Sequence, residues 1–144
     1  MLPGIKNDLM YLLNILECIE KIILYSADCS DAEAFYEKNE QMNFNATLNL
    51  LANIGENTGK ISDELKQIYS EVDWLQIKGL RNRVVHDYIN IDTFRVFDVI
   101  RNDLNPLNST IKNVVGIELS KGNFEAEEYE IAKKSFYYRH IKFE

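Results

Sequence analysis

Four polar side chains that could act on a phosphodiester lie close together in the sequence. They are Arg81, Asn82, His86 and Tyr88, in a chain that has only two histidines. Arginine is a permanent cation, histidine exchanges a proton near neutral pH, and tyrosine offers a hydroxyl. A histidine could remove the proton of a ribose 2′-OH while an arginine stabilises the charge that develops on phosphorus. The set predicts either RNA cleavage without a metal ion or a site that another enzyme modifies.

The spacing of Arg81 and His86 favours a site shared by two copies of the chain. On one straight helix, residues five apart point about 140° away from each other and lie about 7–8 Å apart along the axis. One helix therefore does not easily aim both side chains at one phosphate. Two helices related by a two-fold axis could bring both copies of Arg81 and both copies of His86 into one cleft. We expect a homodimer in which Asn82 orients His86 or binds the phosphate.

Positive charge is concentrated beside these residues. Lys78, Arg81 and Arg83 are the only charged residues between Leu75 and His86, although the whole chain has a net charge of −7. An acidic protein has little general affinity for nucleic acid, so RNA would need a local basic strip. We expect Lys78 and Arg83 to contribute to RNA binding.

The hydrophobic pattern is that of a helical protein. Apolar residues recur at three- and four-residue intervals, which is typical of amphipathic helices, and no useful strand-period alternation appears. We therefore expect an all-α bundle. The longer helices are expected over about residues 5–25, 44–57, 73–88, 92–104 and 124–138, with short helices after Ser30 and Ser62.

Several residues predict where these helices begin and end. Ser30 and Glu33 form a capping-box pattern, and Ser62, Asp73 and Asp92 are expected as further helix starts. Gly55 is expected where another backbone approaches closely. Predicted ends or breaks lie at Gly59, at Pro106 and at Lys121–Asn123.

Composition limits the class of protein. The chain of 144 residues fits one folded unit with a substantial core, and 46% hydrophobic residues are ordinary for a soluble protein. Cys18 and Cys29 form no zinc-binding pattern, so we expect no metal and no cofactor. No secretory leader and no apolar run of the roughly 20 residues that a membrane span requires are apparent, which predicts a cytoplasmic protein.

Several sequence blocks in the right order resemble one known family. Besides Arg81-Asn82 and His86-Asp87-Tyr88, these are Leu51–Glu56, the run from Tyr69 through Trp74 to Asn82, Ile91-Asp92, and Ile100–Pro106 with Asn105 inserted. Over about residues 5–115 the chain resembles the HepT branch of the HEPN superfamily. That branch contains toxin ribonucleases paired with MNT-type nucleotidyltransferase antitoxins, the type VII toxin–antitoxin systems.

The resemblance implies a fold, partners and roles for individual residues. The implied fold is an up-and-down HEPN-like helical bundle that forms a homodimer with a cleft between protomers. Arg81 and His86 would be catalytic, with Asn82 as polar support. Tyr88 matches the position that receives AMP from the cognate nucleotidyltransferase, which would neutralise the toxin. Glu56 matches a family acid, with no catalytic role expected, and could form an ion pair with Arg81.

The C-terminal part departs from the family pattern. We expect a HepT-like helical domain over residues 1–115 and a helical extension over residues 116–144 that packs on the same domain. The extension is rich in aromatic residues, which are common anchors at binding surfaces. It is therefore either one more helix of the bundle or an element that docks the antitoxin or strengthens the dimer.

Other interpretations of these residues remain. Each of His86, Arg81 and Tyr88, taken alone, would more often be structural, and His140 near the C-terminus is expected to be structural. A second hypothesis is a non-catalytic helical adaptor that binds a nucleotidyltransferase and presents Tyr88 to it. A third is a nucleotide-binding module using Arg81 and Lys78, although no glycine-rich phosphate loop accompanies them.

Overall fold

The computed structural model describes residues 4–83 and 91–143, and its regular elements confirm the predicted all-α class. The α-helices are α1 (Asp8–Ser26), α2 (Ala32–Glu37), α3 (Met42–Lys60), α4 (Asp63–Ile68), α5 (Trp74–Lys78), α6 (Thr93–Asn102), α7 (Leu104–Ser120) and α8 (Ala126–Lys133). Three 3-10 helices accompany them: η1 (Lys38–Gln41), η2 (Arg81–Arg83) and η3 (Phe136–Tyr138). Within the described ranges, no helix is long and apolar enough to span a membrane.

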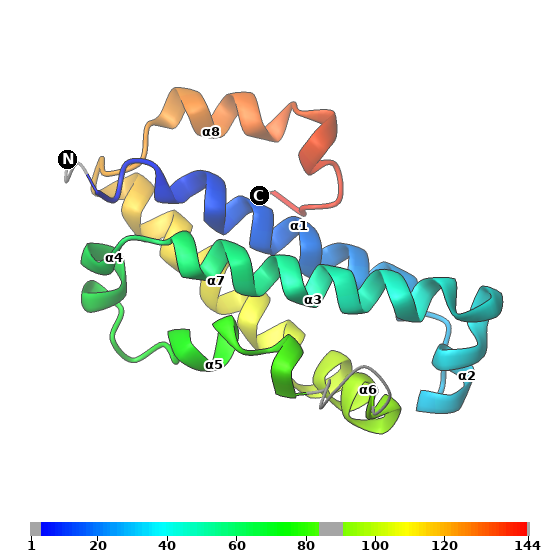
Figure 1. The fold of residues 1–144 in the computed structure, drawn as a ribbon. Helices are drawn as coiled ribbons and strands as arrows, with labels where there is room; N and C mark the ends of the chain where they lie inside the picture. Colours follow the sequence, from blue (N-terminus) through cyan, green and yellow to red (C-terminus); the bar gives the residue numbers. More distant parts are fainter. Residues whose placement is uncertain (1–3, 84–90, 144) are drawn as a thin grey trace.

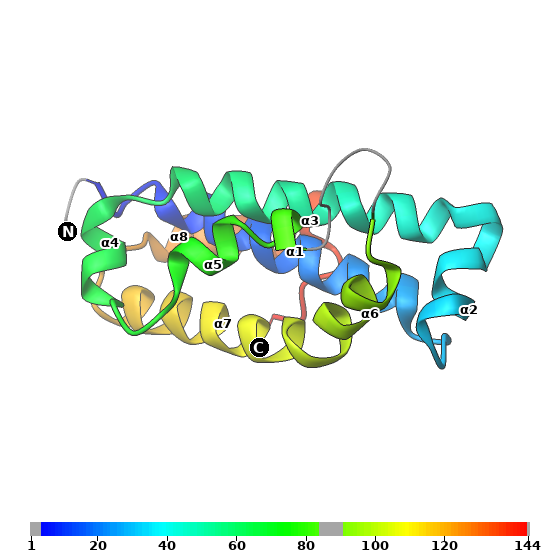
Figure 2. The ribbon, with the colours of Figure 1, turned by 60° about the horizontal axis from the view of Figure 1, so that its bottom comes forward.

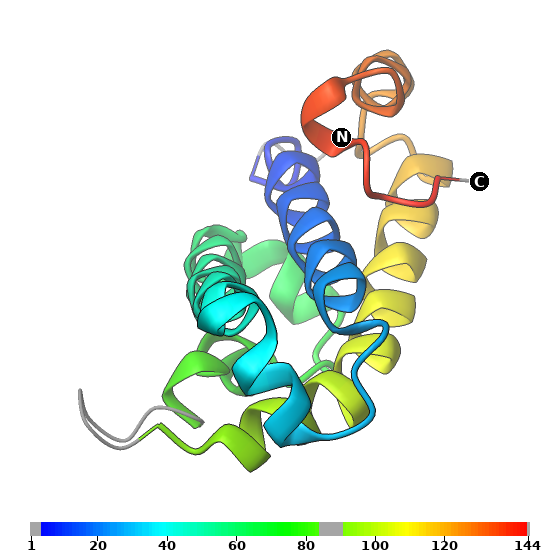
Figure 3. The same ribbon diagram turned by 90° about the vertical axis from the view of Figure 1, so that its right-hand side faces the viewer.

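Two long antiparallel helices, α1 and α3, form the centre of the bundle (Figure 1). Helix α7 packs on α1, and α5 packs on α3. Helix α6 contacts α2 and α7, and it lies with α5 along one side of the molecule. Helix α8 lies on the opposite side, beyond α1 (Figures 1 and 3). The candidate residues near position 81 and the C-terminal extension are therefore on different sides of the fold.

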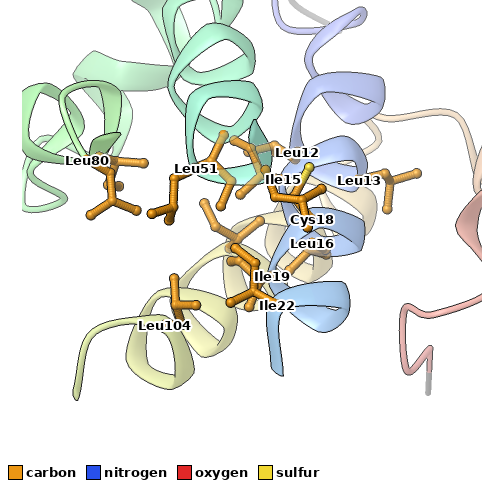
Figure 4. Packing of buried hydrophobic residues seen from close by; sticks show 14 of the residues in the cluster. Leu12, Leu13, Ile15, Leu16, Cys18, Ile19, Ile22, Leu51, Leu80 and Leu104 are labelled. Atoms are coloured by element: carbon orange, nitrogen blue, oxygen red, sulfur yellow. The ribbon is translucent and has the colours of Figure 1, made fainter. Parts of the chain in front are cut away.

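The core is built on α1, whose buried positions follow the predicted three- and four-residue spacing. Leu12, Ile15 and Ile19 are fully or almost fully buried and face Leu51 of α3 and Leu104 of α7 (Figure 4). Burial of one such side chain contributes about 1.5–3 kcal/mol. The match between helical period and burial explains why this sequence forms a bundle.

Polar caps fix the starts of the short helices that lie around the candidate site. The side chains of Ser62, Asp73 and Asp92 accept hydrogen bonds from the backbone N–H groups of Leu65 (3.3 Å), Gln76 (3.0 Å) and Arg95 (3.0 Å), respectively. These three predicted starts are confirmed. The predicted helix start at Ser30 is wrong by one residue. Asp31 caps α2 instead, because its side chain accepts a hydrogen bond from the Ala34 N–H at 2.8 Å.

Three predicted helix limits also differ from the structure. Helix α3 continues through Gly59 to Lys60, so Gly59 is not its cap. The α6–α7 break lies at Asp103, and Pro106 sits in the first turn of α7, where its missing N–H removes no helical hydrogen bond. The last predicted helix is shorter, since α8 ends at Lys133. The break near residue 122 is confirmed, with Gly122 at φ 78°.

Helix α7 crosses the predicted boundary at residue 115 and leads directly into the extension. The extension then returns to α1, where the Tyr138 hydroxyl donates to Asn14 Oδ1 at 2.7 Å and the His140 N–H donates to Glu17 Oε1 at 2.9 Å. The His140 ring also lies 2.5 Å from the other oxygen of buried Glu17. These are structural contacts, as expected for His140.

A buried carboxylate, Glu118 near the end of α7, links three segments. It accepts hydrogen bonds from the Tyr69 hydroxyl (2.5 Å) and the Asn123 amide (2.8 Å), and Lys121 Nζ lies 3.3 Å away. Burial alone would raise the pKa of Glu118, but these donors outweigh burial and lower it. The ionised form of Glu118 therefore stabilises the folded state.

We predict that Glu118→Gln lowers stability mainly at neutral pH. A carboxyl whose folded pKa is lowered contributes stability above its unfolded pKa and loses it as pH falls through the folded value. The variant should lose about 1–3 kcal/mol at pH 7, and the difference should shrink below about pH 4. Urea unfolding from pH 7 to pH 3 measures this. The exposed Glu128→Gln variant serves as control, and parallel pH profiles for wild type and Glu118→Gln would contradict the assignment.

Candidate functional site

The structure describes part of the predicted site. Lys78 is the last residue of α5, and Arg81 and Asn82 lie in the following 3-10 turn η2 (Figure 2). The Arg81 side chain is half-buried, and those of Lys78 and Asn82 are exposed. Arg83 closes the turn, although its side chain is outside the described part. The predicted residues His86 and Tyr88 lie outside the described residues.

The predicted continuous helix over residues 73–88 is wrong in its described part. Helix α5 has five residues and ends at Lys78. Gly79 is its C-cap, and its N–H donates to the Leu75 carbonyl at 3.0 Å. Arg81 is therefore not on one straight helix that begins at Trp74, and the helical spacing of Arg81 and His86 no longer supports a dimer. A glycine inside an apolar helical pattern was the sequence signal for this break.

A close contact between two backbones holds α5 on α3. A Cβ atom built on Gly55 of α3 would overlap the backbone carbonyl of Lys78, so only glycine permits this approach. Ile77 and Leu80 are buried beneath the same segment. The predicted role of Gly55 is therefore confirmed. Its partner is the residue three positions before Arg81.

Hydrogen bonds and buried rings fix the other end of α5. The buried Trp74 indole N–H donates to the Tyr69 carbonyl at 3.0 Å, and Asp73 caps the helix. The Tyr69 ring is itself tied to Glu118 of α7 through its hydroxyl. Arg81 thus follows a segment that is fixed to both α3 and α7. A positively charged side chain presented from a rigid segment is preorganised to bind an anion.

The two sides of α5 differ in charge, with a lysine on one side and acidic residues on the other. Lys78 extends along α3, with its Cε 3.5 Å from the position of a Cβ on Gly59. On the other side, a cavity of about 580 Å³ between α5 and α7 is lined by Glu71, Asp73 and Asp103. A phosphate would be repelled from this acidic cavity, so the Lys78 side of α5 is better suited to an anion.

The ion pair that the sequence suggested between Glu56 and Arg81 does not form in the structure. No group of three or more His, Cys, Asp or Glu side chains that could hold a metal ion occurs in residues 4–83 and 91–143.

The sequence did not predict two exposed apolar side chains on the helices before and after the site. Leu75 on α5 is 81% exposed and Phe94 on α6 is 75% exposed. Their helices lie on either side of residues 81–90 in the sequence and on the same side of the bundle (Figure 2). Apolar side chains on the outer face of such short helices give only a weak periodic signal.

The fold and site define a class of protein: a small helical bundle with an arginine in the turn between α5 and α6. A family model described as Ribonuclease HepT-like matches residues 15–114, and the chain belongs to this family. The predicted resemblance is therefore confirmed. Residues 115–143, which include the end of α7 and the extension, lie beyond the matched region.

Individual relatives agree with the family. The chain is 26% identical over 104 residues to a candidate RNase of Methanocaldococcus jannaschii, which is 72% of this chain and 93% of that protein. It is 24% identical over 94 residues to the protein named "Probable ribonuclease HepT" of Thermococcus cleftensis, 65% of this chain and 83% of the relative. Comparison with solved structures gives no significant match.

We predict that Gly55→Ala destabilises the fold, whereas Gly59→Ala does not. The added methyl at position 55 must push α5 off α3, which should cost about 1–3 kcal/mol. At position 59 a Cβ meets only the flexible end of Lys78, so the better helix propensity of alanine should add up to about 1 kcal/mol. Urea unfolding of both variants measures the difference. Equal stability of Gly55→Ala and wild type would contradict the close contact.

Proposed function

We propose that this chain is a toxin ribonuclease that cleaves RNA without a metal ion, with Arg81 and His86 as catalytic residues and Asn82 as their polar support. Membership of the HepT-like ribonuclease family is the observation that carries the proposal. The rigid mounting of Arg81 next to an exposed lysine supports it, because a phosphodiester needs a fixed cationic site.

The proposed reaction is an internal transesterification. His86 removes the proton from the ribose 2′-OH, and the 2′-oxygen forms a bond to the adjacent phosphorus. The bond from phosphorus to the 5′-oxygen of the next nucleotide breaks, and that oxygen takes up a proton. The products are a 2′,3′-cyclic phosphate and a 5′-hydroxyl. Arg81 stabilises the extra negative charge on the pentavalent phosphorus with its planar fork of donors.

We further propose that the working site is formed by a homodimer. The exposure of Leu75 and Phe94, on the helices before and after the site, supports this, since large exposed apolar side chains favour a partner. A second copy related by a two-fold axis would cover this face with the same residues. It would also bring its own Arg81 and His86 to the shared cleft.

Control of the toxin is assigned to a cognate MNT-type nucleotidyltransferase. In this proposal the Tyr88 oxygen attacks the α-phosphorus of ATP, a Tyr–O–P bond forms, and pyrophosphate leaves. The attached AMP adds bulk and negative charge two residues from His86. It would repel an RNA phosphate by the same electrostatic effect that phosphorylation produces.

A non-catalytic adaptor for the nucleotidyltransferase is the second candidate. The net charge of −7 and the acidic cavity beside α5 favour it, because both oppose RNA binding. An adaptor would accept AMP on Tyr88 and would leave RNA intact, so the two assays below distinguish the candidates.

We expect Arg81→Ala and His86→Ala to abolish RNA cleavage. Loss of one charge-stabilising or acid–base group typically lowers the rate at least about 10²-fold. Cleavage of a labelled RNA in the presence of EDTA measures the rate. Arg95→Ala, which removes an exposed arginine of α6, is the matched control and should retain activity. Undiminished cleavage by both site variants would refute their assignment.

Intact-mass measurement tests Tyr88. Wild-type protein incubated with its nucleotidyltransferase and ATP should gain the mass of one or more AMP units and lose ribonuclease activity. Tyr88→Phe should gain no mass and stay active, because phenylalanine lacks the accepting hydroxyl. Tyr137→Phe removes another exposed tyrosine and should behave as wild type. AMP transfer to Tyr88→Phe at the wild-type level would exclude this acceptor.

A further inference from the structure

A second cavity, about 530 Å³ in volume, lies where the C-terminal residues return to α1 and α7. Its size is within the range of about 300–1,000 Å³ that is common for small-molecule sites. The C-terminal residues Tyr129, Ile141, Lys142 and Phe143 form one wall. All four lie beyond the region matched by the family model. The cavity is therefore a feature that this extension adds to the HepT-like domain.

The floor and one wall of the cavity are apolar. Leu13 and Leu16 of α1 and Ile141 of the extension are buried residues that line it. Leu13 lies on the side of α1 that faces the C-terminal segment (Figure 4). The rings of Tyr129 and Phe143 meet edge to face, with centroids 5.6 Å apart. This surface can cover an aliphatic or aromatic body.

The charge of the lining selects the sign of the ligand. Lys112 of α7 and Lys142 line the cavity, and no Asp or Glu is among its described lining residues. This is unusual for a chain with 23 acidic and 16 basic residues. The cavity beside α5 has the opposite lining, with three acids and no base among the described residues. Glu17, on the same face of α1, is held by His140 and Lys21 and does not line the cavity.

A glycine widens the cavity. Gly116 of α7 lines it, and a Cβ at this position would meet no atom within 4 Å. Glycine inside a helix lowers stability by about 1 kcal/mol relative to alanine, so the open space is retained against helix propensity.

From this geometry we infer that the cavity binds a small organic anion with an apolar body, a carboxylate on an alkyl or aryl group. The apolar body lies on Leu13, Leu16 and Ile141, and the carboxylate lies at Lys112 and Lys142. A bound ligand would connect the extension to α1 and α7. The inference does not depend on RNA cleavage, and its test uses no RNA.

Isothermal titration calorimetry with decanoate tests the site on the full chain. Decanoate should bind at least about tenfold more tightly than decanol, which has the same chain without the charge. Hydrogen exchange should slow in residues 112–116 and 139–143 when decanoate is bound. Equal binding of decanoate and decanol, or no binding, would overturn the inference.

Two kinds of variant locate the binding. Gly116→Leu fills the cavity while improving helix propensity and should abolish decanoate binding, whereas Gly116→Ala should largely retain it. Lys112→Glu with Lys142→Glu should weaken binding about tenfold or more. A control variant that carries both Lys6→Glu and Lys60→Glu has the same change in net charge outside the cavity. Its decanoate binding should be close to that of wild type. Full binding by Gly116→Leu or by the Lys112/Lys142 pair would overturn the inference.

Discussion

The position of the Arg81 turn depends on one backbone-to-backbone contact between α3 and α5. Gly55 lets the Lys78 carbonyl approach α3 where any side chain would intervene. Ile77 and Leu80 then reach the core, and the chain turns at Arg81, whose side chain is half-buried. A loop of the same composition without this contact would hold the arginine in many orientations, which lowers its value as a preorganised cation.

Much of the fold follows from local sequence signals. Asp73, Asp92 and Ser62 begin helices because their side chains satisfy free N–H groups, and the spacing of apolar residues gives α1 and α3. Gly55 was also predictable, because glycine inside a helical pattern indicates a close approach. Gly79 was a signal for the end of α5, but the apolar period that continues past it favoured a longer helix, so this end was not predicted. The turn at Asn39–Gln41, with φ values of 51°, 55° and 70°, was not predicted, because only Asn39 is of a type that favours positive φ.

The contacts of the extension could not be predicted for a different reason. Tyr138 with Asn14, and His140 with Glu17, join residues more than a hundred positions apart. Such pairs depend on where the chain returns, which no local pattern encodes. The same holds for the two cavities, whose linings have opposite charge: Lys112 of α7 lines one cavity, and Asp103, which precedes α7, lines the other. An acidic chain can thus keep positive charge where an anion binds.

Mixing two inactive variants tests most directly whether the catalytic centre belongs to a pair of molecules. Arg81→Ala and His86→Ala are each expected to form inactive dimers, but a hybrid dimer would contain one intact arginine and one intact histidine in the shared cleft. After co-refolding, with hybrids verified by native mass spectrometry, the account predicts that RNA cleavage is recovered above the level of either variant alone. Hybrids that form and leave RNA uncut would contradict it.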